Sequence, residues 1–147
     1  MTMRIKFLRN IEKKVKGIIN RLFINKTEFS IISNNCWGTF IYKKYGLNYQ
    51  SPFVNLFVFA PDYIELLENF SMKILRNISF IEHKDSRHKE ELISLGIYES
   101  DYPIGVLEDK YELHFLHYST QKDAKEKWLK RINRINTKKL IFKFSAD

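Results

Sequence analysis

The spacing of apolar residues along the chain changes several times, and each change predicts a new element of secondary structure. Over residues 1–26 apolar positions recur at intervals of three and four, which predicts an amphipathic helix. Residues 29–33 then form a short β-prone run. A second helical pattern covers residues 36–45 and closes at Gly46, the usual place for a C-cap. The stripe of the first helix comprises Phe7, Leu8, Ile11, Val15, Ile18, Ile19 and Leu22.

The middle of the chain mixes extended and helical patterns. Residues 50–59 have the pattern of a strand or an extended core segment, closed by Pro61. A helix is predicted from Pro61 or Asp62 to about Asn69, because proline suits a first helical turn. Residues 74–81 have the pattern of a strand, and the charge-dense residues 83–91 predict a loop or the start of an exposed helix.

The last third predicts a hairpin, a helix and a strand. Residues 106–107 and 111–118 are the two strands of the hairpin, joined by a turn at 108–110. Thr120 with Asp123 three residues later resembles a capping box. The helix that follows has Ala124, Trp128, Ile132 and Ile135 on one side, and residues 140–144 form the final strand.

This alternation of strands and helices indicates the α/β class. We expect one layered domain over residues 27–147, with a mixed or parallel sheet, preceded by the basic amphipathic helix of residues 1–26. Composition agrees with this expectation. At 147 residues, 44% hydrophobic, the chain is long enough for one core and unlike collagenous, disulfide-rich or disordered chains.

Composition also bears on location. The longest apolar run of the chain, residues 53–61, is far shorter than the ~20 residues that a membrane span needs. The N-terminus lacks the apolar core of a signal peptide, and a single Cys fits a reducing compartment. The sequence therefore predicts a cytoplasmic protein.

Positive charge is concentrated at the N-terminus. Residues 1–26 hold eight Lys and Arg against Glu12 alone, so they carry nearly all of the net charge of +8. A basic amphipathic helix could bind an anionic membrane surface, at the inner face of the cell membrane. Alternatively, it packs its apolar stripe on the domain and leaves its lysines solvated. Nucleic acid is not an expected partner, because no zinc-finger or RNA-recognition signature is present.

Candidate chemistry centres on Cys36, which stands at a predicted strand-to-helix junction. A helix N-terminus stabilises a thiolate through its partial positive charge and its N–H groups. Those N–H groups, or the side chains of Asn34 and Asn35, could form an oxyanion hole. The structural alternative is a small, buried, unreactive cysteine with the two asparagines serving as turn and cap.

A base for Cys36 could come from the predicted hairpin strand, which carries His114 and His117. Side chains alternate along a strand, so at most one of them can face the cysteine. Asp109 or Asp101 could then orient the imidazole. The alternative is that His114 is a hydrogen-bonded core residue and that His117 lies on the surface.

Other site types have weaker support. His114 and His117 have a poor spacing for two metal ligands on a strand, so no metal site is expected. No glycine-rich phosphate loop or dinucleotide fingerprint is present. In the basic last helix, Arg131 and Arg134 could together bind a phosphate or carboxylate, although a solvated basic face is the commoner reason for such a run.

The sequence contains five ordered blocks, at residues 29–52, 102–105, 114–118, 124–128 and 131–136. Together these blocks resemble the DUF1919 family, which is also known as an exopolysaccharide biosynthesis protein family. The resemblance covers roughly residues 27 to 147. Two departures stand out: Thr39 follows Gly38 where the family has a second glycine, and family members continue well beyond the last strand. The resemblance thus implies a member that is short at its C-terminal end.

The resemblance implies a role in bacterial capsule or exopolysaccharide synthesis, and some members carry an acetyltransferase label. Our leading hypothesis is therefore an acyl or acetyl transferase acting on a sugar or lipid-linked glycan, with a donor such as acetyl-CoA and no tightly bound cofactor. Cys36 would accept the acyl group, His114 would be the base and Asp109 would orient it. The expected binding residues are Asn34, Asn35, Trp37, His117, Arg131 and Arg134.

Two other hypotheses remain open. One is a papain-like Cys hydrolase that uses the same residues with water in place of a sugar. The other is a non-catalytic accessory protein that binds a glycan or a synthase. The high aromatic content, with 8 Tyr, 12 Phe and 2 Trp, suits stacking on sugars.

Overall fold

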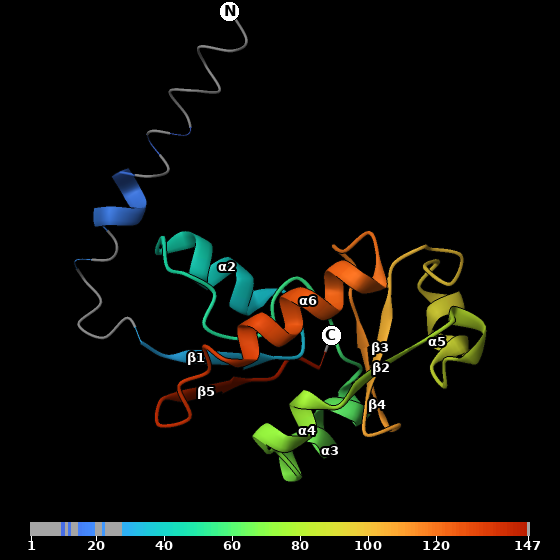
Figure 1. Cartoon of the computed structure of the whole chain (residues 1–147). Coiled ribbons are helices and arrows are strands. Elements are labelled where there is room, and N and C mark those ends of the chain that lie inside the picture. The colour runs from blue at the N-terminus through green and yellow to red at the C-terminus, as the bar shows by residue number, and fades with distance from the viewer. Residues whose placement is uncertain (1–9, 11, 13–14, 20–21, 23–27, 147) are drawn as a thin grey trace, which may run out of the picture.

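The computed structural model of the chain describes residues 10, 12, 15–19, 22 and 28–146 (Figure 1). All of the described residues before position 28 are helical, and Lys16 donates a hydrogen bond to Glu12 one turn earlier (3.1 Å). The rest of the predicted helix over residues 1–26 lies outside the described residues. Within the described part of the chain, no helix combines the length and apolarity needed to cross a bilayer.

The strands form two sheets, where the sequence predicted one. β1 and β5 pair in parallel, and β2, β3 and β4 follow one another as an antiparallel meander. The α/β class and the single layered domain are confirmed. The strands are β1 (Ser30–Ser33), β2 (Ile78–Ile81), β3 (Ile104–Leu107), β4 (Tyr111–His114) and β5 (Leu140–Lys143).

An extended segment at Phe57 and Val58 connects the two sheets. Phe57 exchanges backbone hydrogen bonds with His114 at the end of β4 (3.0 and 2.9 Å), and the Val58 N–H donates to the Asn34 carbonyl just after β1 (2.9 Å). The sequence predicted a strand or an extended core segment over residues 50–59, and the second is closer: Phe53, Val54, Leu56 and Val58 are buried, and the segment pairs with the sheets only at this bridge. Its first half turns instead, since Pro52 has no N–H to donate and Asn55 has a left-handed φ of 60°.

Helices cover the sheets, and two of them in the described part of the chain begin at a residue whose side chain caps the first turn. The Thr120 hydroxyl accepts from the Asp123 N–H (3.1 Å), as the capping pattern predicted. The predicted strand over residues 74–81 is wrong in its first half, because Ser71 caps a short helix there (3.3 Å to Ile74 N). The helices are α2 (Trp37–Lys44), α3 (Ala60–Glu68), α4 (Met72–Arg76), the 3-10 turn η1 (His83–Asp85), α5 (Lys89–Ser94) and α6 (Gln121–Ile132).

The main core lies under α6, which crosses in front of the sheets in Figure 1. Trp128 packs edge-on against Phe53 and Phe115 (ring centroids 5.2 and 5.9 Å apart), and its indole N–H donates to the Leu75 carbonyl (2.7 Å). A buried indole with its N–H satisfied contributes packing without a desolvation cost. The predicted buried side of this helix is confirmed for Ala124, Trp128 and Ile132.

Candidate functional site

Cys36 occupies the predicted strand-to-helix junction, as the N-cap residue of α2. Its Sγ lies 3.8 Å from the Leu56 carbonyl oxygen, in a half-buried position. Burial raises the pKa of the Cys36 thiol, against a smaller lowering by the Lys43 charge. The environment therefore favours the thiol, and the helix terminus does not produce the lowered pKa that its dipole alone would favour.

Of the two candidate histidines, His117 lies with Cys36. Both line a pocket of about 350 Å³ together with Thr39, Lys43 and Asn55, and the His117 side chain is exposed. His114 is fully buried and is not among the residues that line this pocket. The catalytic pairing of Cys36 with His114 thus remains a prediction. Cys36 lies at a surface pocket, whereas His114 lies in the buried interior.

The two asparagines hold the backbone at the end of β1. Asn34 donates to the Ser145 carbonyl (2.7 Å) and accepts from the Ser145 N–H (2.9 Å), which fastens the C-terminal segment. The Asn35 side chain accepts from the N–H of Trp37 (3.1 Å), as a helix-capping residue does, and the Trp37 side chain is exposed.

Asp109 and the two arginines lie elsewhere. Asp109 is exposed in the β3–β4 turn with a φ of 53°, whereas His114 stands at the opposite end of β4. Arg131 donates to the Tyr118 hydroxyl and stacks 5.0 Å from the Tyr49 ring, and Arg134 donates to the Tyr49 carbonyl (3.2 Å). Both guanidinium groups are thus engaged by the protein itself.

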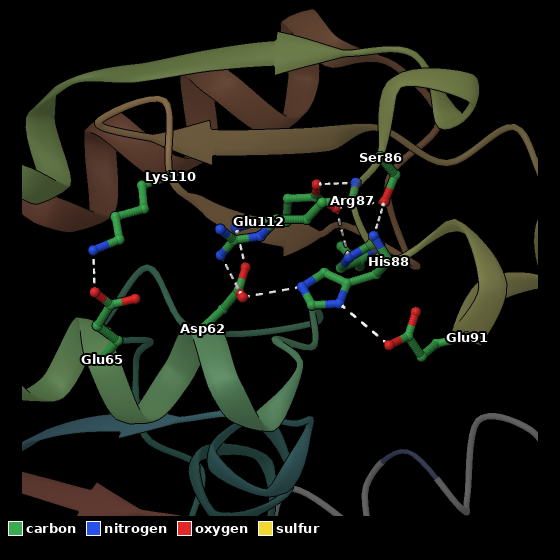
Figure 2. A network of polar contacts seen from close by, with 9 residues as sticks. Asp62, Glu65, Ser86, Arg87, His88, Glu91, Lys110 and Glu112 are labelled. Atoms are coloured by element: carbon green, nitrogen blue, oxygen red, sulfur yellow. Dashed lines mark hydrogen bonds and ion pairs between the residues drawn. The ribbon is translucent and has the colours of Figure 1, made fainter.

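The structure brings together a different set of side chains, which we call the buried polar cluster: Asp62, Ser86, His88, Glu112 and His114. They come from the first turn of α3, the residues between η1 and α5, and β4, and each side chain is more than nine-tenths buried. Figure 2 shows His88 between Asp62 on one side and Glu91 on the other. A group of this kind inside a small domain must be held by internal hydrogen bonds.

Asp62 is the centre of the cluster. One carboxylate oxygen faces the His88 ring (Nε2, 3.0 Å) and pairs with Arg87, and the other accepts from the Glu112 backbone N–H (2.8 Å). Burial alone would raise the pKa of Asp62, but the hydrogen bonds from His88, Arg87 and Glu112 together lower it. Asp62 is therefore ionised near neutral pH.

Glu112 fixes the segment that carries His88. Its carboxylate accepts from the Ser86 hydroxyl (2.6 Å) and from the Arg87 backbone N–H (2.8 Å). The Ser86 oxygen in turn accepts from the His88 N–H (3.1 Å). The loop between η1 and α5 is thereby tied to the sheet at two successive residues, Ser86 and Arg87, and Ser86 in turn holds the backbone of His88.

His88 has the geometry of a general base held by a carboxylate. Burial would lower its pKa, but the hydrogen bond and charge of Asp62 raise it above the ordinary value. The ring packs against Phe59 (centroids 4.3 Å apart), and the second nitrogen, Nδ1, lies 3.9 Å from a Glu91 carboxylate oxygen. With Nε2 held by Asp62, Nδ1 is the atom that can accept a proton from a substrate.

His114 has the opposite character. Its Nδ1 shares a hydrogen bond with the Tyr102 hydroxyl (3.1 Å), and its ring stacks on Phe57 (4.5 Å). Burial and the neighbouring charge of His88 lower the pKa of His114 to about 3. The imidazole is thus neutral and inaccessible, which favours the structural interpretation of this residue.

A pocket of about 550 Å³ opens beside His88 and Glu91. This size falls within the range of small-molecule sites. Most of its other lining residues are apolar. They are Phe57, Val58, Phe59, Ala60, Pro61, Leu95, Ile97, Leu116 and Ala146, with Asn34, Asn35 and Ser145 as the polar exceptions.

Sequence reasoning missed Asp62, His88 and Glu112. Asp62 resembles any acidic residue in a first helical turn, and His88 is hidden in a run of charged residues. One signal was present: Glu112 and His114 stand two residues apart on an otherwise apolar strand, so both point to one face. Two polar side chains on the same face of a buried strand indicate a polar network rather than plain core.

Comparison with known proteins gives two matches. A family model described as "Domain of unknown function (DUF1919)" matches residues 7–147. An "Uncharacterized protein" of Haemophilus influenzae (strain ATCC 51907 / DSM 11121 / KW20 / Rd) is 31% identical over 140 residues, which cover 88% of this chain and 60% of the relative. The chain thus spans about 60% of the length of that relative. With nearly all of its length matched by the family model, the chain belongs to the DUF1919 family.

Proposed function

We propose that this protein transfers an acyl group to a sugar hydroxyl during exopolysaccharide or capsule synthesis, with His88 as the general base. The observation that carries the proposal is the Asp62–His88 pair at the wall of the 550 Å³ pocket. The biological setting comes from the family resemblance of the sequence.

In the proposed step, His88 Nδ1 takes the proton of the sugar hydroxyl while the oxygen attacks the carbonyl carbon of an acyl thioester such as acetyl-CoA. A C–O bond forms and the C–S bond breaks. His88 then gives the proton to the departing sulfur. Asp62 stabilises the imidazolium that forms, and Arg87 and the Glu112 N–H keep Asp62 in place.

A covalent route through Cys36 has less support. Its thiol has a raised pKa, and the histidine that shares its pocket is His117. A papain-like hydrolase would need Cys36 as a thiolate at neutral pH. We therefore place the chemistry at His88.

The N-terminal segment supports a location at the inner face of the cell membrane. Among its described residues, Ile18 and Leu22 are 63% and 77% exposed, on a segment with a net charge of +7. Exposed apolar side chains beside many Lys and Arg suit an anionic lipid surface, where lipid-linked glycans are assembled.

The test measures thiol release from acetyl-CoA and longer acyl-CoA donors in the presence of hexoses and nucleotide sugars. We expect His88→Asn to lower kcat by about 10²- to 10⁴-fold. Cys36→Ser should stay near the wild type, and His117→Asn is the matched control.

Loss of activity in Cys36→Ser with full activity in His88→Asn would reverse the assignment. Thiol release at the same rate without any sugar would indicate a hydrolase. No turnover with any pair, together with glycan binding, would indicate an accessory protein.

A further inference from the structure

The apolar residues that line the pocket beside His88 come from several parts of the chain. They are Phe57 and the apolar residues up to Pro61, then Leu95 and Ile97 just after α5, Leu116 after β4, and Ala146. Leu95 and Leu116 are partly exposed there, so the rim of the pocket is apolar too.

Several polar groups at this pocket are already engaged by the protein. The Asn34 side chain is bound on both sides by Ser145, and the Asn35 oxygen accepts from Trp37. His88, Glu91 and the amide nitrogen of Asn35 are the side-chain groups left to face a ligand among these residues, too few for all the hydroxyls of a sugar ring. A sugar ring has a hydroxyl on nearly every carbon, and each buried hydroxyl without a partner costs free energy. A saturated chain needs no such partners.

We infer that this pocket binds the acyl chain of the donor, that the carbonyl lies at His88, and that the chain is longer than acetyl. The inference rests on the proposed function and specifies its substrate. An acetyl group has a single methyl to bury, whereas the pocket has a volume of about 550 Å³. The sugar then approaches from the exposed side, at Glu91.

The test is a binding series with S-acyl-N-acetylcysteamine thioesters of two, four, six, eight and ten carbons. Isothermal titration calorimetry on the full chain, without a sugar acceptor, gives the dissociation constants. Affinity should rise by up to about fourfold for each added CH₂ until the pocket is filled. Equal affinity for the two-carbon and eight-carbon thioesters would overturn the inference.

Two matched variants locate the binding. Leu95 and Ile93 are 59% and 54% exposed near the same end of α5, but only Leu95 lines the pocket. Leu95→Gln should weaken binding of the eight-carbon thioester roughly five- to tenfold, while Ile93→Gln stays near the wild type. An equal loss in both variants, or in neither, would contradict the assignment.

The pocket could instead take the lipid tail of a glycan acceptor, and alkyl glucosides of the same chain lengths test this alternative. Tighter binding of the glucosides than of the thioesters would overturn the assignment to the donor. The outcomes are separable from the proposed function. Chain-length-dependent binding with no turnover would keep the acyl-chain pocket but refute the transferase, whereas turnover with no chain dependence would keep the transferase and refute the acyl-chain pocket.

Discussion

Protonation of His114 should make the fold sensitive to mild acid. The ring is fully buried, and its pKa is about 3 in the folded protein against about 6.5 in an unfolded chain. Between these values the unfolded chain binds a proton that the folded protein does not. Because the folded pKa of this histidine is lowered, its contribution to stability is present above about pH 6.5 and is lost as the pH falls.

The magnitude follows from linkage. A group that titrates only in the unfolded state changes the free energy of unfolding by about 1.4 kcal/mol per pH unit once it is fully protonated there. Allowing for the gradual onset near pH 6.5, His114 should contribute a loss of about 2 kcal/mol between pH 7 and pH 5. His88 and Asp62 also titrate, in opposite directions, but they do so with or without His114.

The assay is urea unfolding of the wild type and of His114→Gln at pH 7 and pH 5. Glutamine is neutral and retains an amide that can bond to Tyr102, so it removes the titration and leaves a polar side chain in place. We expect the variant to lose about 2 kcal/mol less than the wild type over this pH range. His117→Gln, an exposed histidine three residues away, should lose as much as the wild type. Equal losses in all three proteins would refute the reasoning.

Three further predictions test other parts of the structure. Asp62→Asn should destabilise the fold by about 3 kcal/mol in the same urea assay, because Arg87 and His88 lose their buried partner. The control variant Asp109→Asn changes an exposed residue and should cost little, so a loss in Asp62→Asn no larger than in this control would contradict the prediction. Alkylation of Cys36 by iodoacetamide should reach half its maximal rate above about pH 8.5, because burial raises the thiol pKa, and a midpoint below pH 8 would argue against it. The full chain should sediment with anionic vesicles and not with zwitterionic ones, more weakly after Leu22→Asp, and equal sedimentation of that variant would refute the lipid surface.

Elements with a local signal were predictable from the sequence. β1 ends where polar residues begin, α2 starts after Cys36 and stops before Gly46, and Thr120 caps α6. Each of these boundaries depends on residues within one helical turn of each other. Local chemistry fixes them before any tertiary contact forms.

Elements decided by distant contacts were not predictable. Residues 50–59 have a strand pattern, yet they pair with the sheets only through the backbone bonds of Phe57 to His114 and of Val58 to Asn34. The strand predicted over residues 111–118 stops at His114 because the chain turns there. The next residues turn back, with the Tyr118 N–H donating to the Phe115 carbonyl (3.0 Å).

The candidate site was hidden for the same reason. Asp62, His88 and Glu112 lie at least 24 residues apart in sequence and meet only through the packing of α3 and the 86–88 segment on β4. Cys36 attracted attention because its position at a helix start is visible in the sequence. Asp62, His88 and Glu112 have buried, charged surroundings in the fold, but nothing in the sequence next to each of them indicates this.

The position of His88 is fixed more tightly than stability requires. Its ring is held by Asp62 and packed on Phe59, and its backbone N–H is held by Ser86. Buried ion pairs contribute little net stability, since desolvation offsets most of their attraction, and an apolar cluster of the same volume would serve the core as well. A histidine that acts as a base must be oriented and must keep one ring nitrogen available. His88 meets both conditions, because Asp62 fixes one side of its ring and Nδ1 lies towards Glu91 at the pocket. The cost of burying Asp62 and Glu112 is therefore better explained by the proposed role of His88 as a base than by the fold.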